Sequence, residues 1–179
     1  VKLSGTRFYY LKNEGTMLEL AVMRYALDFL IQRGFTPMTV PVLVREHAMM
    51  GTGYFPGGED QAYKMKEDDL YLVGTAEVSL ASYHYDEILD VKQLPIKSAA
   101  WSNCFRREAG TYGKDTHGLY RIHQFMKVEQ VIVMEEDDEK SLQMLDYLLK
   151  NATDFLQSLE VPYQVVAVCS GDIGQGQVK

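Results

Sequence analysis

Two shortages in the sequence, few cysteines and no long apolar run, exclude several classes of protein. The 179 residues include two cysteines, Cys104 and Cys169, both in apolar, strand-like segments. Their spacing fits neither a disulfide framework nor a zinc site, so a reducing cytoplasm is the expected location. No apolar segment reaches the roughly 20 residues of a membrane span, and no signal peptide opens the chain, so we expect no membrane partner.

Positive charge is also in short supply. The chain has 18 Lys and Arg against 25 Asp and Glu, a net charge of −7, whereas nucleic-acid binders usually present a basic surface. Part of the excess is the acidic run 135–139, which we interpret as the solvated start of a helix, where negative charge is favourable. The four histidines show no metal-ligand spacing, so we predict no metal-binding residue.

The first half of the chain combines a helix with a proline-containing strand. Thr16 and Glu19 have the spacing of a capping box, and apolar residues then recur at helical intervals, which predicts a helix from about 16 to 33. An extended, β-branched segment follows at 35–44, and its two prolines favour an edge position because each lacks a backbone donor.

Further elements follow a glycine-rich loop. We expect a short strand around 71–73, a helix beginning near 75 or 76, a hairpin over about 96–133, a long amphipathic helix and a last strand at 163–169. Because the large central element is a hairpin rather than a βαβ crossover, the sequence favours an α+β fold with an antiparallel sheet.

The hairpin is the most informative segment. Alternation along its strands predicts one shared face that carries arginines, an aromatic ring and carboxylates. Arginine forks suit phosphate oxygens, a phenylalanine ring can stack on a nucleobase, and carboxylates accept hydrogen bonds from amines. The alternative is a solvated sheet face with cross-strand charge pairs. The residues on the predicted face are Arg106, Glu108, Arg121, Phe125 and Glu129.

Two segments resemble the signature motifs of the class II aminoacyl-tRNA synthetases. The helix and the strand from Gly34-Phe35-Thr36-Pro37 to Pro41 are similar to motif 1, about 16–45. Phe105-Arg106-Arg107-Glu108, through Gly118, to His123-Gln124-Phe125 and Glu129 is similar to motif 2, about 97–133. Gly74-Thr75-Ala76-Glu77 and the run from His123 to Glu129 narrow the resemblance to the seryl-tRNA synthetase family.

The resemblance implies a single, partial catalytic domain over 1–179, with an antiparallel sheet flanked by helices. It also implies activation of L-serine by ATP with Mg²⁺, transfer of the seryl group to tRNA(Ser), and a homodimer formed through motif 1. No side-chain nucleophile is needed, because the serine carboxylate attacks and catalysis consists of alignment and charge neutralisation.

Residue roles follow from the same resemblance. Arg106 matches the arginine at the α-phosphate, and Glu108 matches the residue near the adenine amine and the tRNA acceptor end; both are the catalytic candidates. The nucleotide site would comprise Arg106, Arg107, Glu108, Arg121, Ile122 and Phe125, with Arg121 on the distal phosphates and Phe125 stacked on adenine. The serine pocket would comprise Thr75, Ala76, Glu77 and Glu129. The loop at 109–118, with Lys114, Asp115 and His117, would close on a ligand.

The chain also departs from the family pattern. It has neither the N-terminal helical arm that reaches tRNA nor motif 3, whose arginine contacts the γ-phosphate, so we expect a fragment with weak or no activity alone. Two alternatives remain open: a related ligase that loads an amino acid onto a carrier protein, and a non-catalytic binding or dimerisation module with the same fold.

Overall fold

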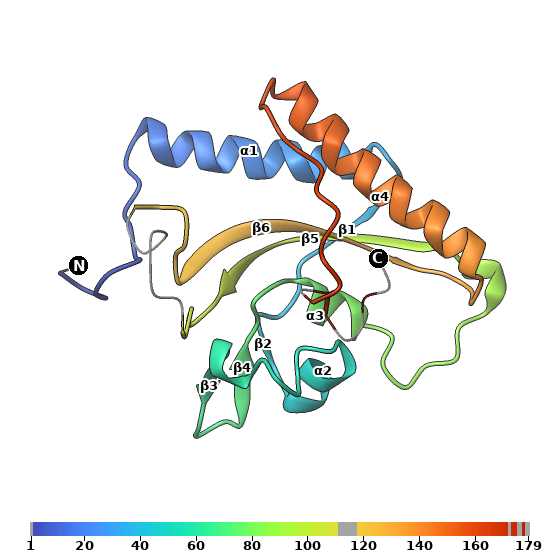
Figure 1. Ribbon diagram of the computed structural model, residues 1–179, viewed down its shortest axis with the longest axis horizontal. Helices are drawn as coiled ribbons and strands as arrows, with labels where there is room; N and C mark the ends of the chain where they lie inside the picture. The colour runs from blue at the N-terminus through green and yellow to red at the C-terminus, as the bar shows by residue number, and fades with distance from the viewer. Residues whose placement is uncertain (1, 111–117, 172, 175–176, 178–179) are drawn as a thin grey trace.

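The computed structural model describes residues 2–110, 118–171, 173–174 and 177. Their strands form two three-stranded sheets, one in the order β1-β5-β6 and one in the order β2-β4-β3 (Figure 1). The strands are β1 (Thr36–Met38), β2 (Leu43–Val44), β3 (Tyr63–Met65), β4 (Leu70–Leu72), β5 (Ile96–Phe105) and β6 (Gln124–Val133). The helices are α1 (Glu14–Ile31), α2 (Glu46–Gly51), α3 (Glu77–Ala81) and α4 (Asp138–Ser158), with short 3-10 turns η1 (Glu59–Gln61) and η2 (Val91–Gln93).

The long hairpin of β5 and β6 is the centre of the fold, as the sequence predicts. The two strands pair antiparallel over their full length, from Ile96 opposite Val133 to Phe105 opposite Gln124. β1 adds to β5 in parallel, so the sheet is mixed, and Pro37 lies on an edge strand where its missing N–H costs no ladder bond.

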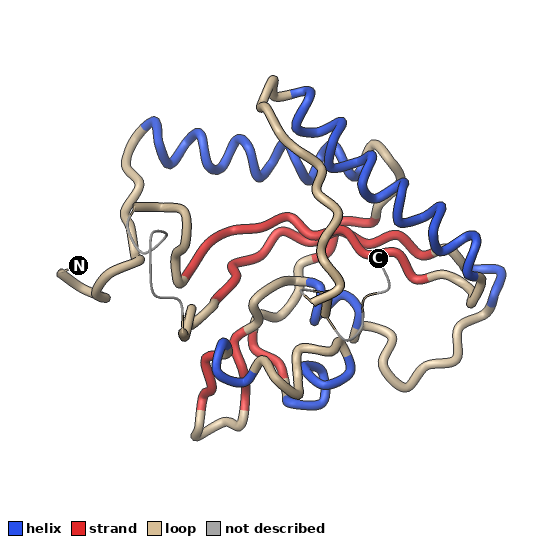
Figure 2. Tube along the Cα trace, viewed as in Figure 1, coloured by secondary structure: helices blue, strands red, loops and turns tan. Residues whose placement is uncertain are grey.

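Helices cover both faces of this hairpin. α1 and α4 lie together along one face, and α3 lies against the other (Figures 1 and 2). On the first face Leu30, Phe35 and Ala99 form a buried cluster; on the second, Ala76, Leu80 and Ala100 form another. Ala99 and Ala100 point to opposite faces because side chains alternate along a strand, and their small size lets helices approach the sheet closely.

The smaller sheet packs with α2 around its own apolar cluster, which includes Met49, Phe55 and Tyr71. Backbone hydrogen bonds at Val73 extend the β2–β4 pairing of this sheet and join it to the end of β5. The Val73 amide donates to Val42 O at 2.9 Å, and the Phe105 amide donates to Val73 O at 2.9 Å. The end of β5 is therefore held beside the residues that follow β4.

Four details differ from the sequence predictions. α1 begins at Glu14 behind Asn13 without a side-chain cap, and Glu19 accepts from the Tyr9 hydroxyl at 2.9 Å, so the predicted capping box is wrong. The segment 35–44 divides between two sheets as β1 and β2, since Pro41, between the two strands, lacks the N–H that a continuous ladder needs. β3 was not predicted at all.

The fourth difference is the predicted last strand. Residues 163–169 are not a strand, and Val165, Val166 and Val168 are more than half exposed. Strand propensity alone does not make a strand, because backbone groups need a neighbouring strand to pair with. No helix in the described parts of the chain is both long and apolar enough to cross a membrane.

Candidate functional site

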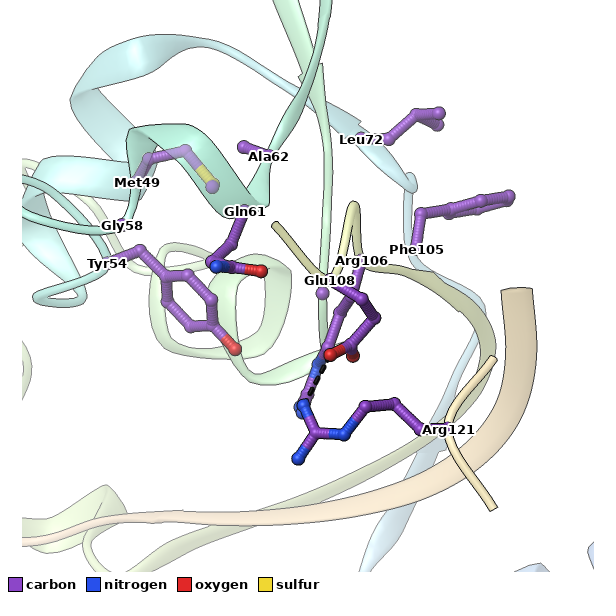
Figure 3. Close-up of a pocket in the computed structure, with 11 residues that line it drawn as sticks. Met49, Tyr54, Gly58, Gln61, Ala62, Leu72, Phe105, Arg106, Glu108 and Arg121 are labelled. Carbon is purple, nitrogen blue, oxygen red and sulfur yellow. Dashed lines mark hydrogen bonds and ion pairs between the residues drawn. The ribbon is translucent and has the colours of Figure 1, made fainter. Parts of the chain in front are cut away.

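A cavity of about 330 Å³ opens where β5 ends, and two predicted arginines line it (Figure 3). Figure 3 shows Arg106 and Glu108 close together, with Arg121 reaching the Glu108 carboxylate from the segment before β6. We call this the arginine cavity. Its lining is Met49, Tyr54, Gly58, Gln61, Ala62, Leu72, Gly74, Phe105, Arg106, Glu108 and Arg121.

Glu108 is held in an unusual conformation. Its φ is 52°, in the left-handed region, where a residue with a side chain costs about 1 kcal/mol or more and needs support from its surroundings. The carboxylate is 8% exposed and accepts from Arg121 Nη1 at 2.5 Å, while Arg7 Nη1 lies 3.4 Å from the Glu108 carbonyl oxygen. The Arg121 guanidinium is thus the direct partner of this little-exposed carboxylate.

Arg106 projects from the end of β5 with its backbone fixed by the hairpin. Its amide donates to His123 O at 3.0 Å, and its guanidinium carbon lies 5.4 Å from the centre of the Phe125 ring. Gly74 lies directly beneath it: a Cβ on Gly74 would meet Arg106 Nε at 3.6 Å and the Tyr54 ring at 3.5 Å. The Gly74 backbone thus forms a floor over which the exposed guanidinium can meet a ligand oxygen.

Buried polar groups form the adjoining part of the site. Thr75 is fully buried, and its hydroxyl donates to Glu129 Oε2 at 2.7 Å. Lys127 Nζ lies 2.8 Å from the same oxygen, and the Glu77 amide donates to Thr75 Oγ1 at 3.2 Å. Glu129 lies opposite Ala100 in the register, on the sheet face that α3 covers. The Thr75 turn is therefore tied to the centre of β6.

Glu77 faces a second cavity, of about 470 Å³, which we call the Glu77 cavity. Partial burial and the neighbouring Glu129 carboxylate raise the pKa of Glu77, while Lys127 opposes the shift. Two carboxylates and one ammonium leave a local excess of negative charge that suits a small cationic group. The lining is Thr52, Gly53, Tyr54, Pro56, Gly57, Gly58, Glu77, Gly174 and Gln177.

Tyr54 separates the two cavities and was missed by the sequence analysis. It lines both cavities, and in Figure 3 its hydroxyl points into the arginine cavity. Burial raises the pKa of Tyr54, with the Arg106 cation opposing the shift, so the phenol stays protonated as a hydrogen-bond donor at neutral pH. Its only sequence signal was an aromatic residue within a glycine-rich loop.

The other predicted site residues lie at different distances from these cavities. Arg107, Ile122 and Phe125 line neither of them, and Arg107 lies near Tyr63, whose pKa it lowers against the effect of burial. Ala76 is fully buried in the cluster under α3, so its side chain packs in the core. The loop residues Lys114, Asp115 and His117 lie outside the described residues.

The described residues contain no group of three or more potential metal ligands among His, Cys, Asp and Glu. Glu108 is the carboxylate that lines the arginine cavity, and Arg121 already contacts it. Mg²⁺ typically takes one or two carboxylates together with substrate phosphates. The site therefore fits a magnesium ion that arrives with a polyphosphate better than one held by the protein alone.

Comparison with known proteins identifies the family. The model of the class II tRNA synthetase core domain (G, H, P, S and T) matches residues 62–178. The chain belongs to this family. It is 47% identical over 177 residues to the serine–tRNA ligase of Deinococcus radiodurans, a match that covers 99% of this chain and 42% of the relative. The chain thus spans about two fifths of the length of such curated relatives.

Solved structures agree with this assignment. The seryl-tRNA synthetase of Pyrococcus horikoshii complexed with ATP superposes with a TM-score of 0.90 at 49% identity, covering 97% of this chain and 38% of that one. The cytoplasmic serine–tRNA ligase of Naegleria fowleri, in complex with AMP, gives a TM-score of 0.90 at 36% identity, covering 96% and 40%. The predicted α+β fold of a class II synthetase is confirmed.

Proposed function

We propose that this chain is the catalytic core fragment of a serine–tRNA ligase that activates L-serine with ATP and transfers it to tRNA(Ser). The observation that carries the proposal is the adjacency of two unlike cavities that share Tyr54 in their linings, one lined by Arg106 and Arg121 and one lined by the Glu77 carboxylate. Polyphosphate and ammonium groups need these opposite environments. High identity to serine–tRNA ligases supports the choice of serine.

The first step joins serine to the nucleotide. The serine carboxylate oxygen attacks the α-phosphorus of ATP, a new P–O bond forms, and the bond to pyrophosphate breaks, giving seryl-adenylate. Arg106 would neutralise charge on the α-phosphate, and Arg121 would hold the distal phosphates, with Arg107, Ile122 and Phe125 around the nucleotide. Mg²⁺, bound mainly by those phosphates, would supply further charge neutralisation.

The acyl side would recognise serine itself. The ammonium group would lie between Glu77 and Glu129, where both carboxylates would attract it. Thr75 positions Glu129 through its 2.7 Å hydrogen bond, and Ala76 packs behind the turn. A polar pocket of this kind rejects analogues without a hydroxyl, because their binding leaves buried polar groups unpaired.

The second step transfers the seryl group. A terminal ribose hydroxyl of tRNA(Ser) attacks the carbonyl carbon, the ester bond forms, and AMP leaves with the electron pair of the broken C–O bond, while the hydroxyl proton passes to the departing phosphate. Glu108, at the rim between the cavity and the 109–118 loop, would face the acceptor end. Because the proposed partners are ATP and tRNA(Ser), the expected location of the protein is the cytoplasm.

A second copy of the chain would dock on the motif 1 region, 16–45. Several large apolar side chains of this region are exposed in the single chain, which suits burial against a partner copy. They include Met17, Leu18, Leu20, Tyr25 and Ile31. Sedimentation equilibrium on the complete protein should give a dimer, and Leu18→Glu should raise the monomer fraction; a monomeric complete protein would contradict this.

The test of the activity is amino-acid-dependent ATP–pyrophosphate exchange by the complete protein that carries this chain. We expect exchange with serine and at least 100-fold less with alanine or glycine, because neither analogue carries a hydroxyl. If the complete protein catalysed ATP–pyrophosphate exchange with another amino acid but not with serine, the assignment of serine as the substrate would be overturned. Loading of a carrier protein instead of tRNA(Ser) would favour the carrier-protein ligase.

A further inference from the structure

Gln61 contacts both neighbours of Glu108. The Gln61 carbonyl oxygen accepts from the Arg107 amide at 2.9 Å. Its side-chain amide makes a two-bond pair with Ala109: Oε1 accepts from the Ala109 amide at 3.2 Å, and Nε2 donates to the Ala109 carbonyl oxygen at 3.0 Å. Three hydrogen bonds from one residue therefore bracket Glu108 on both sides in the sequence.

The bracketed residue is the one that needs support. Glu108 has a φ of 52° without being glycine, so its backbone persists in this region only if its neighbours fix it. This conformation turns the chain after Arg107 and keeps the carboxylate, which is 8% exposed, against Arg121 at 2.5 Å. If the bracket were lost, the backbone could relax toward a commoner conformation and the carboxylate would move away from Arg121.

The position of Gln61 limits the expected effect to one side of the site. Gln61 lines the arginine cavity and is absent from the lining of the Glu77 cavity. It is exposed and belongs to none of the buried clusters, so replacing its side chain removes little packing. The Gln61 side chain is an uncharged carboxamide, so it cannot neutralise phosphate charge directly.

We propose that Gln61 is a positioning residue, which sets the backbone of Glu108 and thereby the Glu108–Arg121 pair on the phosphate-binding side. The kinetic part of this proposal rests on the proposed function, whereas its structural part does not. The amide pair with Ala109 carries the effect, because the bond from Arg107 goes to the Gln61 backbone and survives any side-chain substitution.

The kinetic experiment uses Gln61→Ala in the complete protein and ATP–pyrophosphate exchange. We expect the KM for ATP to rise about tenfold, the equivalent of one or two neutral hydrogen bonds, and the KM for serine to stay within about twofold. Gln61→Asn keeps the amide but is one methylene shorter, so it should behave like Gln61→Ala. Gln93→Ala is the matched control, since Gln93 also ends a 3-10 turn and is exposed.

The structural experiment is hydrogen exchange followed by mass spectrometry on a peptide that contains Ala109. The Ala109 amide should exchange about tenfold faster in Gln61→Ala and Gln61→Asn than in the parent protein and in Gln93→Ala. The proposal would be overturned if hydrogen exchange at Ala109 or the KM for ATP stayed unchanged in Gln61→Ala, or if the KM values for ATP and for serine rose equally. If the parent protein showed no serine-dependent ATP–pyrophosphate exchange, the proposed function would be overturned. Hydrogen exchange at the Ala109 amide would still test whether Gln61 fixes the backbone around Glu108.

Discussion

Compared with the hydrogen-bonded pair of Thr75 and Glu129, the arginine cavity relies on side chains from the ends of strands and the segments beyond them. Arg106 is exposed, and Arg121, with 42% of its side chain exposed, lies in the segment before β6. Thr75 and Glu129, in contrast, lie within the body of the fold, the first fully buried and the second paired across the hairpin with Ala100. The two sides differ in how firmly packing fixes their polar groups.

This difference matches what each ligand requires. A small amino acid is discriminated by desolvated groups in fixed positions, since a missing hydroxyl then leaves a buried partner unpaired. A polyphosphate needs neutralisation spread over several oxygens, which exposed guanidinium groups can supply with some freedom of movement. Tyr54 and Gly74 lie next to each other and next to Arg106.

The largest expected effect comes from removing charge on the phosphate side. Arg106→Ala in the complete protein should lower kcat/KM for serine-dependent exchange about 100- to 1,000-fold, because in its proposed role this cation would stabilise charge on the α-phosphate in the transition state. The free energy of unfolding should change little, since Arg106 is exposed. Lys150→Ala removes an exposed cation from α4 and should leave exchange unchanged. Equal activity of Arg106→Ala and Lys150→Ala would remove the basis for a phosphate role.

A smaller effect, with the opposite selectivity, is expected from Thr75→Val. The substitution keeps the shape but deletes the hydrogen bond to Glu129, so the KM for serine should rise about tenfold and the free energy of unfolding should fall by about 1 to 2 kcal/mol. Ser79→Ala deletes another hydrogen bond of the same helix region, from Ser79 Oγ to Pro41 O at 2.6 Å. It should lower stability without raising the KM for serine. If both variants raised that KM equally, general destabilisation would explain the result.

The smallest effect concerns pH. Because the pKa of Glu77 is raised above its ordinary value of 4.5, serine binding should be lost as pH falls through this raised pKa, at a higher pH than an ordinary carboxyl would give. Lys127→Met removes the cation that opposes the shift, so the acid limb of kcat/KM for serine should move to still higher pH. An acid limb that stayed in place in Lys127→Met would contradict the assignment.

The same shift has a consequence for stability. The folded protein binds a proton at Glu77 more tightly than the unfolded chain does, so the ionised carboxylate lowers stability above the raised pKa. Glu77→Gln should therefore raise the free energy of unfolding slightly at neutral pH, measured by urea denaturation. Its exchange activity should fall at the same time, because the carboxylate for the ammonium group is lost.

The sequence predicted the hairpin and the alternating faces of its two strands, because period-two alternation over ten residues is a strong local signal. The predicted strand face was wrong for Arg106, Glu108 and Arg121, which lie beyond the ends of β5 and β6. The predicted strand at 163–169 was wrong. Its β-branched residues favour a strand, but strand pairing depends on neighbours that are distant in the sequence. The predicted capping box of Thr16 and Glu19 was also wrong, because the Glu19 carboxylate accepts a hydrogen bond from the Tyr9 hydroxyl instead. Local patterns carry no information about such competing partners.

For the site, motif spacing pointed to charged residues but not to the residues that support them. Arg106, Glu108 and Arg121 line one cavity, whereas Phe125 and Glu129, predicted for the same face, do not line it, and the roles of all five stay predictions. Tyr54 and Gln61 were missed because their roles depend on tertiary contacts with Gly74 and with the residues around Glu108, which no spacing rule encodes. The positive φ of Glu108 was equally invisible, since glutamate rarely adopts it.

The most direct test of the two-sided site compares Arg121→Ala with Thr75→Val in the complete protein, with both KM values measured for each variant by ATP–pyrophosphate exchange. We predict a crossed result: Arg121→Ala raises the KM for ATP about tenfold or more and leaves the KM for serine within about twofold, whereas Thr75→Val does the reverse. Parallel rises in both KM values in both variants would contradict the division of the site between phosphate and amino-acid recognition.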